Sequence, residues 1–392
     1  MKKFLLSAII ATTVLPAMAD LEGNGYYRVQ NAITKRYAYL LDNKGSFNAA
    51  TGSIDVQALE LFLGFSKACS DPATVFYIDK TNSTSSKIEY DVAGQGTSLH
   101  GFLNHYLYVL PGKKIDGVQA YYAYGQDGTM IKYLGDRNPS LTEDKGLASV
   151  DVSGDRRLWY IDPVVADSSD GYFGVAPSIE CGGKYYYPMY AGFPYAAYSE
   201  GIKFYTVTKV NPWAEDPAVC LHEVTGVIPE GTPVIIECTH QLPADNRLNV
   251  GAEGSKADVG GNLLKGVYFN NDDVIHGNRK AYDRKTMRIL TVKDGKLCFD
   301  VADIDYLPRN QAYLQLSETQ QYGVECFKVV SEEEYEAQYD AVDELETLST
   351  VDVYSLDGSL LISGAVKEEI SSLGKGLYIV RSGTSSRKMV VR

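Results

Sequence analysis

Short runs of alternating apolar and polar residues recur along this chain, and Gly, Asn and Asp separate them at regular spacing. Val, Ile, Tyr and Phe supply most of the apolar positions. A period of two puts every second side chain on the same face, so such runs between turn residues are typical of β-strands. The pattern therefore predicts an all-β protein. Two segments depart from it, because residues 56–65 permit a short helix and the charged run 332–344 lacks a strong apolar period.

A β-hairpin unit repeats loosely three times within residues 20–165. The units contain Tyr-rich strands, and apolar closing strands lie at 75–79 and 158–163. Units that repeat over roughly 45 residues bury a shared core, which indicates a closed barrel with three lobes. The opening Gly-Tyr-Tyr-Arg-Val-Gln-Asn and the Tyr-Leu-x-Asp step resemble β-trefoil modules of the ricin-B type. The resemblance implies a β-trefoil-like domain. The family's Gln-x-Trp signature is absent, so its sugar-binding residues are not carried over.

The next region, residues 166–330, repeatedly places Pro and Gly turns before fully apolar strands. Examples are Val-Ile-Pro-Glu-Gly-Thr-Pro-Val-Ile-Ile at 227–236 and Leu-Pro-Arg-Asn-Gln-Ala-Tyr-Leu at 307–314. Fully apolar runs fit buried strands of a sandwich. The phrases resemble a β-sandwich-like module that recurs in surface proteins of gut-type Gram-negative bacteria, so we expect a β-sandwich-like domain here. A charged linker or short helix, residues 331–349, follows it.

Residues 350–392 have the pattern of a small β-module. Asp357-Gly358 stands between two alternating apolar runs. Asp-Gly is a strong hairpin signal, because a type I′ turn needs positive φ at both central residues. Two further apolar runs lie at 377–381 and 388–392.

This module resembles the C-terminal sorting domain of the bacterial type IX secretion route. The resemblance rests on the V-x-V-Y-x-L-D-G hairpin, the K-G-L-Y-I-V-R strand and the terminal K-x-V-V-R strand. It implies a small β-sandwich that engages the secretion machinery. The residues that carry it are Asp357, Gly358, Gly376 and Tyr378. The chain departs from the family at Leu360, where an Arg is usual, and in 344–349, which replace a Pro-Asn-Pro-like start.

The first 19 residues have the three parts of a secretory signal peptide. Lys2 and Lys3 form the charged region, an apolar stretch follows to Leu15, and Ala17-Met18-Ala19 is a cleavage site of the A-x-A kind. We therefore expect cleavage after Ala19 and a secreted or outer-surface location. No stretch reaches 18 uninterrupted apolar residues, so no transmembrane helix is predicted.

The acidic balance excludes one class of partner. The chain carries a formal net charge of −13, which becomes −15 when Lys2 and Lys3 leave with the signal peptide. Nucleic-acid binding needs clustered Lys and Arg, so no nucleic-acid partner is expected. The 30 tyrosines fit half-exposed strands and sugar or protein contacts alike.

Six cysteines are widely spaced and form no C-x-x-C pair, so neither zinc nor a redox motif is indicated. Cys220 and Cys238 flank the turn-rich stretch 226–233. If Val224 pairs with Val234, antiparallel register places these two cysteines opposite each other. This is a disulfide hypothesis, and buried free thiols are the alternative.

Catalytic motifs are missing from the chain. It contains no H-E-x-x-H, no P-loop and no G-x-S-x-G elbow. Its five histidines are scattered, and its acidic loops, such as Asp300, Asp303 and Asp305, lack EF-hand spacing. The sequence therefore predicts neither a cofactor nor a metal, and it favours a non-enzymatic protein.

An aromatic stretch at 185–198 is the candidate contact surface. Aromatic faces stack on sugar rings or on the prolines of a partner. The alternative is a strand pair that turns the same rings into the core. The candidate ligand-binding residues are Tyr185, Tyr186, Tyr187, Tyr190 and Tyr195.

We expect a secreted or cell-surface binding protein whose ligand is a glycan or a surface protein. Two alternatives stay open. One is a secreted hydrolase, a glycosidase or peptidase, whose site is assembled from distant loops. The other is a structural component of a surface assembly. Two facing carboxylates in a cleft would favour the hydrolase. An exposed apolar strand edge would favour the surface assembly. An exposed tyrosine platform would favour the binding protein.

Overall fold

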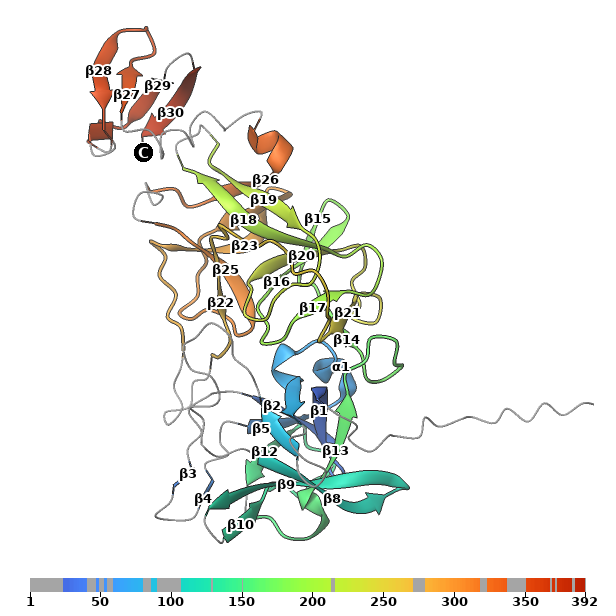
Figure 1. Cartoon of the computed structure of the whole chain (residues 1–392). Coiled ribbons are helices and arrows are strands. Elements are labelled where there is room, and N and C mark those ends of the chain that lie inside the picture. Colours follow the sequence, from blue (N-terminus) through green and yellow to red (C-terminus); the bar gives the residue numbers. More distant parts are fainter. Residues whose placement is uncertain are drawn as a thin grey trace, which may run out of the picture.

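Strands make up about half of the residues that the structure describes, and the helices among them are short (Figure 1). The all-β class is therefore confirmed. The signal peptide lies outside the described residues. The computed structural model describes residues 24–40, 47–48, 53–54, 59–79, 86–89, 107–127, 130–149, 151–212, 216–270, 279–317, 323–336, 350–366, 369–370, 372–382 and 385–391.

In the described part of the first region, six strands close a ring. Each strand pairs antiparallel with the next, and the last returns to the first. A closed ring leaves no strand edge open. In ring order the strands are β1 (Gly25–Asn31), β6 (Phe76–Asp79), β7 (Ser86–Glu89), β8 (Leu107–Ile115), β9 (Val118–Asp127) and β13 (Leu158–Pro163).

Hairpin excursions leave this ring between its strands. The first is β2 (Arg36–Leu40) with β5 (Leu59–Leu63), and the last is β10 (Met130–Tyr133), β11 (Gly135–Asp136) and β12 (Lys145–Ser149). The two meet where β5 pairs with β12. The segment between β7 and β8 lies outside the described residues. A closed ring with such excursions agrees with the expected barrel, and kinship with ricin-B modules stays a prediction.

The core of the ring forms around Trp159, which is fully buried. Its indole N–H donates to the carbonyl of Leu134 at 3.0 Å, so the ring is buried without an orphaned donor. The ring region also contains β3 (Phe47–Asn48), which pairs with β4 (Ser53–Ile54), and the 3-10 turn η3 (Gly154–Arg157).

The helix expected within residues 56–65 is wrong for residues 59–63, and residues 56–58 lie outside the described part of the chain. Residues 59–63 form β5, which lies between β2 and β12 and buries Leu61 and Phe62. Pairing on both sides outweighs helical propensity, because propensity is a weak prior. The helix α1 is four residues, Phe65–Ala68, and the 3-10 turn η1 (Pro72–Thr74) follows it. The charged run is helical at 332–336, and the rest of it lies outside the described residues.

The second region is built on a long sheet that curls on itself. Cys181 at one end donates to the carbonyl of Gly295 near the other end, at 3.5 Å, and apolar side chains from both halves form one cluster. Pairing within the described sheet is antiparallel except for β19 and β26. In sheet order the strands are β15 (Ile179–Cys181), β16 (Lys184–Met189), β20 (Val234–Cys238), β18 (Lys203–Asn211), β19 (Ala218–Val224), β26 (Phe327–Ser331), β24 (Lys296–Asp300), β23 (Met287–Lys293), β25 (Gln311–Gln315) and β22 (Leu264–Val267).

A smaller sheet joins the second region to the first. It consists of β14 (Phe173–Gly174), β21 (Arg247–Val250) and β17 (Tyr195–Ala197). The amide of Gly174 donates to the carbonyl of Cys69 at 2.8 Å, and the rings of Tyr26 and Phe193 lie 6.1 Å apart. The two regions therefore meet through a packed junction.

The C-terminal module is a four-stranded antiparallel sheet in the described residues, with its own apolar core. Its order is β28 (Leu360–Ala365), β27 (Val351–Tyr354), β29 (Gly376–Ser382) and β30 (Ser385–Val391). The predicted hairpin is present as β27–β28. Its turn is not type I′. Gly358 donates to the carbonyl of Ser355 at 3.0 Å, and Gly358 has a φ of 86° whereas Asp357 does not have positive φ. This is the geometry of a type I turn followed by a left-handed glycine.

The hypothesis of a Cys220–Cys238 disulfide is wrong. β18 lies between β19 and β20, so Val224 pairs with Phe204 and not with Val234. Two strand spacings amount to about 10 Å, beyond the Cα separation of about 7 Å that a disulfide can span. All six cysteines lie in the described part of the chain and are free thiols. None of the helices described is long and apolar enough to cross a membrane.

Candidate functional site

The tyrosine stretch does not form an exposed platform. Tyr195 is 0% exposed and Tyr190 is 6% exposed. The Tyr190 ring packs on Tyr268, with ring centroids 4.1 Å apart, and Tyr195 stands among the aromatic rings of the core beneath β17. Neither residue can reach a ligand without unfolding its surroundings, so the expectation that they bind one is wrong.

The other three tyrosines alternate along β16. Tyr185 and Tyr187 pack against one apolar cluster, and Tyr186 packs against the other. The hydroxyl of Tyr186 donates to a carboxylate oxygen of Glu237 at 3.1 Å, and burial together with that carboxylate raises its pKa. β16 therefore lies between two packed layers. Its tyrosines fit the alternative, in which the rings turn into the core, better than they fit an exposed contact surface. Of these three tyrosines, Tyr187 alone lines the cleft that is described below.

The residues of the sorting motif occupy a turn and a strand. Asp357 accepts from the amide of Ser359 at 3.1 Å, which fixes the β27–β28 turn. Gly376 begins β29, and the hydroxyl of Tyr378 donates to the carbonyl of Gly374 at 2.7 Å. Their role in export stays a prediction.

A cleft of about 540 Å³ lies at the junction of the first two regions. Its lining residues belong to β2, β5, α1, η1 and the start of β12 on one side, and to β16 and the turn before β25 on the other. Figure 1 shows where the labelled elements of the two regions lie. Its lining residues are Tyr39, Phe62, Ser66, Lys67, Ser70, Asp71, Pro72, Asp144, Lys145, Tyr187, Arg309 and Asn310.

An ion pair joins the two regions across this cleft. The two terminal nitrogens of Arg309, Nη1 and Nη2, donate to the Asp71 carboxylate, at 3.0 and 2.6 Å. The guanidinium also lies over the Tyr39 ring, 5.2 Å from its centroid. Asp71 is held in place because it caps η1 by accepting from the amide of Ala73 at 3.0 Å. A bidentate pair fixes orientation as well as distance, so the walls have a defined geometry.

A second ion pair, between Lys67 and Asp144, stands in the wall formed by the first region. The Asp144 carboxylate also accepts from the amide of Leu63 at 3.0 Å. The Lys67 ammonium and then this amide hold the pKa of Asp144 below its usual range. Asp144 is therefore a carboxylate, not a proton donor, at neutral pH.

Aromatic surface completes the lining. The rings of Tyr39 and Phe62 lie 4.9 Å apart and are tilted by 59°. The hydroxyl of Tyr39 donates to Glu60. Burial, and next the Asp71 carboxylate, raise the pKa of Tyr187 to about 12, so its hydroxyl stays protonated and can donate.

A buried node behind the wall positions the loop that carries Asp144. Arg36 donates to the carbonyls of Asn138, Ser140 and Glu143 and pairs with Asp136 at 2.6 Å. The loop 137–144 is thereby fixed against β2.

Sequence reasoning missed this site. Asp71 and Arg309 are 238 positions apart, and no local pattern joins them. The one available signal was Asp71-Pro72, an N-cap followed by Pro at the first helical position. It predicts a turn, not a ligand site.

Comparison with known proteins adds no relative. No protein-family model matches the chain, and no curated protein or solved structure is significantly similar to it. A function for this protein is therefore inferred from the geometry of the molecule alone.

Proposed function

We propose that the protein binds a saccharide in the cleft between its first two regions. The observation that carries the proposal is the pairing of aromatic surface with planar polar groups in one cleft: Tyr39 and Tyr187 stand beside the Arg309–Asp71 pair. Sugars present apolar C–H faces and rings of hydroxyls, so aromatic faces and fixed donors and acceptors suit them.

The charge of the lining narrows the ligand class. Among the described lining residues, Lys67, Lys145 and Arg309 are cationic, and Asp71 and Asp144 are carboxylates. The cleft thus carries an excess of positive charge in a chain whose net charge is −13. Lys145 has no ion-pair partner among the residues that the structure describes. A saccharide that bears a carboxylate or sulfate would place its charge there, and a neutral sugar would lack that contact.

We favour binding over hydrolysis at this cleft, although two carboxylates line it. A glycosidase needs one carboxyl group whose pKa is raised so that it can protonate the leaving group. Asp144 is shifted the other way by Lys67. Both oxygens of Asp71 are occupied by Arg309, and one also by the amide of Ala73. Neither group is free to act as the acid.

The test is a glycan array probed with the full mature chain, followed by titration calorimetry with the best hit. We expect Tyr39→Ala and Arg309→Met each to weaken binding at least tenfold. The matched controls are Tyr306→Ala, which removes another ring in contact with an arginine, and Arg284→Met, which removes another arginine paired with a carboxylate. Equal losses in variants and controls, or no hit with folded protein, would remove the proposal.

We also propose that the C-terminal module is the export address. What supports this is a small sheet with its own core and an apolar outer strand: Leu360 and Leu361 on β28 are 51% and 48% exposed. An apolar strand at a sheet edge offers backbone and side chains to a partner such as the secretion machinery. Deletion of 350–392 should leave the protein inside the cell envelope, whereas Ser386→Ala, an exposed change in the same module outside the quoted motifs, should not. Normal export of the deletion variant would contradict this role.

A further inference from the structure

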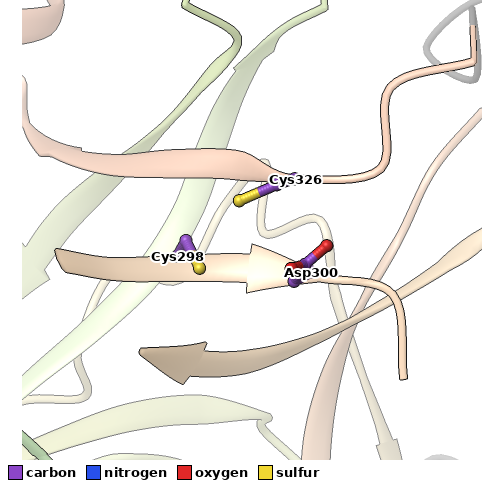
Figure 2. A group of neighbouring side chains, drawn as sticks. All are labelled: Cys298, Asp300 and Cys326. Carbon is purple, nitrogen blue, oxygen red and sulfur yellow. The ribbon is translucent and has the colours of Figure 1, made fainter. Parts of the chain in front are cut away.

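Two thiols and a carboxylate gather on one face of the long sheet, outside the cleft. Cys298 and Asp300 belong to β24, and Cys326 directly precedes β26, its antiparallel neighbour (Figure 2). The two Sγ atoms and a carboxylate oxygen all lie within 4.8 Å of one another. Cys298 is 2% exposed and Asp300 8%, whereas Cys326 is half-buried. The group is thus largely dry with one side near solvent.

Strand register explains why the three meet. Cys298 pairs with Lys328 and Phe299 with Phe327, so Cys326 comes opposite Asp300. Side chains alternate along a strand, and Phe299 and Phe327 both enter the apolar core. The three donor groups therefore share the other face. The sequence could not indicate this, because 298 and 326 have no metal-ligand spacing.

The geometry suits a bridging cation better than a disulfide. Cys298 and Cys326 are diagonal neighbours, whose Cα atoms in a typical sheet are about 7–8 Å apart. A disulfide spans about 4.4–6.8 Å between Cα atoms, and both thiols are free. A tetrahedral Zn²⁺ with Zn–S bonds of about 2.3 Å holds its sulfurs roughly 3.8 Å apart. Small side-chain movements from the present spacing achieve that arrangement.

We propose that Cys298, Asp300 and Cys326 form a binding site for a thiophilic divalent cation of the Zn²⁺ class. Two thiolates and one carboxylate are the ligands, and the fourth position faces solvent beside Cys326. Thiolate and carboxylate donors together select such a cation over Mg²⁺, which prefers oxygen alone. On binding, both thiols release their protons.

The surroundings of Asp300 complete the site. One oxygen accepts from the Lys293 ammonium at 2.8 Å, and the other accepts from the amide of Val301 at 2.8 Å. Such outer bonds orient a ligating carboxylate. Three anionic ligands and a dication leave a charge of minus one, which the Lys293 ammonium balances.

The experiment uses the full chain with its thiols reduced and metals stripped by chelator, titrated with ZnCl₂ by calorimetry. We expect one equivalent to bind, Mg²⁺ not to bind, and Cys298→Ser and Cys326→Ser each to lose at least a factor of ten in affinity. Lys293→Met should lower the affinity for Zn²⁺ 10- to 100-fold, which is the usual effect of removing a group that hydrogen-bonds to a metal ligand. Cys181→Ser, a half-exposed cysteine elsewhere in the same sheet, should bind like the parent.

A second measurement needs no variant. Zn²⁺ should protect the half-buried Cys326 of the parent chain from alkylation, located by peptide mass spectrometry, and leave Cys181 reactive. Three results would overturn the proposal: unchanged Zn²⁺ binding in the Cys298→Ser/Cys326→Ser double variant, no selective protection, or a Cys298–Cys326 disulfide in protein purified without reductant.

Discussion

Replacing Asp136 by Ala should destabilise the first region strongly. Its carboxylate pairs with Arg36 at 2.6 Å, and both side chains are 0% exposed. The same carboxylate accepts from the hydroxyl of Thr34 at 2.6 Å and from the amide of Asn138 at 2.9 Å. The substitution therefore removes the negative charge that balances the buried guanidinium of Arg36. It also removes the hydrogen-bond acceptor of the Thr34 hydroxyl and of the Asn138 amide.

The magnitude follows from what is left behind. Breaking a buried ion pair by removing one partner costs about 3–5 kcal/mol, because the remaining charge is buried without compensation. Arg36 keeps four hydrogen bonds to three backbone carbonyls, but these carry no charge, and the N–H group that donated to Asp136 loses its acceptor. Loss of the acceptor for Thr34 adds about 1 kcal/mol. We therefore expect the free energy of unfolding to fall by about 4–6 kcal/mol, at the upper end if the loop 137–144 stays in place.

Urea denaturation followed by circular dichroism measures this loss. The control is Asp155→Ala, which breaks a 2.6 Å pair with Lys113 whose side chains are about half exposed. An exposed pair contributes at most about 1 kcal/mol. The double variant Arg36→Met/Asp136→Leu should regain much of the loss, since it leaves no buried charge. If Asp136→Ala costs no more than the Asp155→Ala control, the reasoning from burial is refuted.

Two further perturbations test other parts of the molecule. Burial, and next Asp170, raise the pKa of Asp162 from 3.8 to about 6, so the folded state holds this proton more tightly than the unfolded state. The contribution to stability is complete below pH 4 and is lost as pH rises to about 6; it amounts to about 3 kcal/mol. Asp162→Asn should remove that decline in denaturation curves taken between pH 4 and 7, and parallel curves for both proteins would contradict it. Gly266→Ala would place a Cβ 2.1 Å from the Tyr190 ring, which stacks on Tyr268 and cannot retreat. The overpacking should cost about 1–3 kcal/mol, and a neutral thermal shift would show that the ring yields.

The sequence identified strands well because a period of two and turn residues are local signals. The β27–β28 hairpin appears where Asp357-Gly358 predicts it. Its turn type differs because only Gly358 takes positive φ. Local pattern also misjudged 59–63, where pairing with strands on both sides decides the structure.

Contacts between residues far apart in the chain could not be predicted from the sequence. β18 enters between β19 and β20, and this insertion separates Cys220 from Cys238. The tyrosines at 190 and 195 are amphipathic, so composition fits a surface and a core equally, and only the packed junction decides for the core. The cleft depends on Asp71 and Arg309, which no spacing joins.

Hydroxyl-radical footprinting of the full chain tests whether a saccharide binds in the cleft. The protein is labelled with and without a saturating amount of the saccharide selected on the array, and oxidation is located by mass spectrometry. We predict that Tyr39 and Tyr187, which line the cleft, become protected, while oxidation of Tyr198, which lies elsewhere and is 53% exposed, is unchanged. Protection of Tyr198 or of another surface with Tyr39 and Tyr187 unaffected would contradict a saccharide site in the cleft.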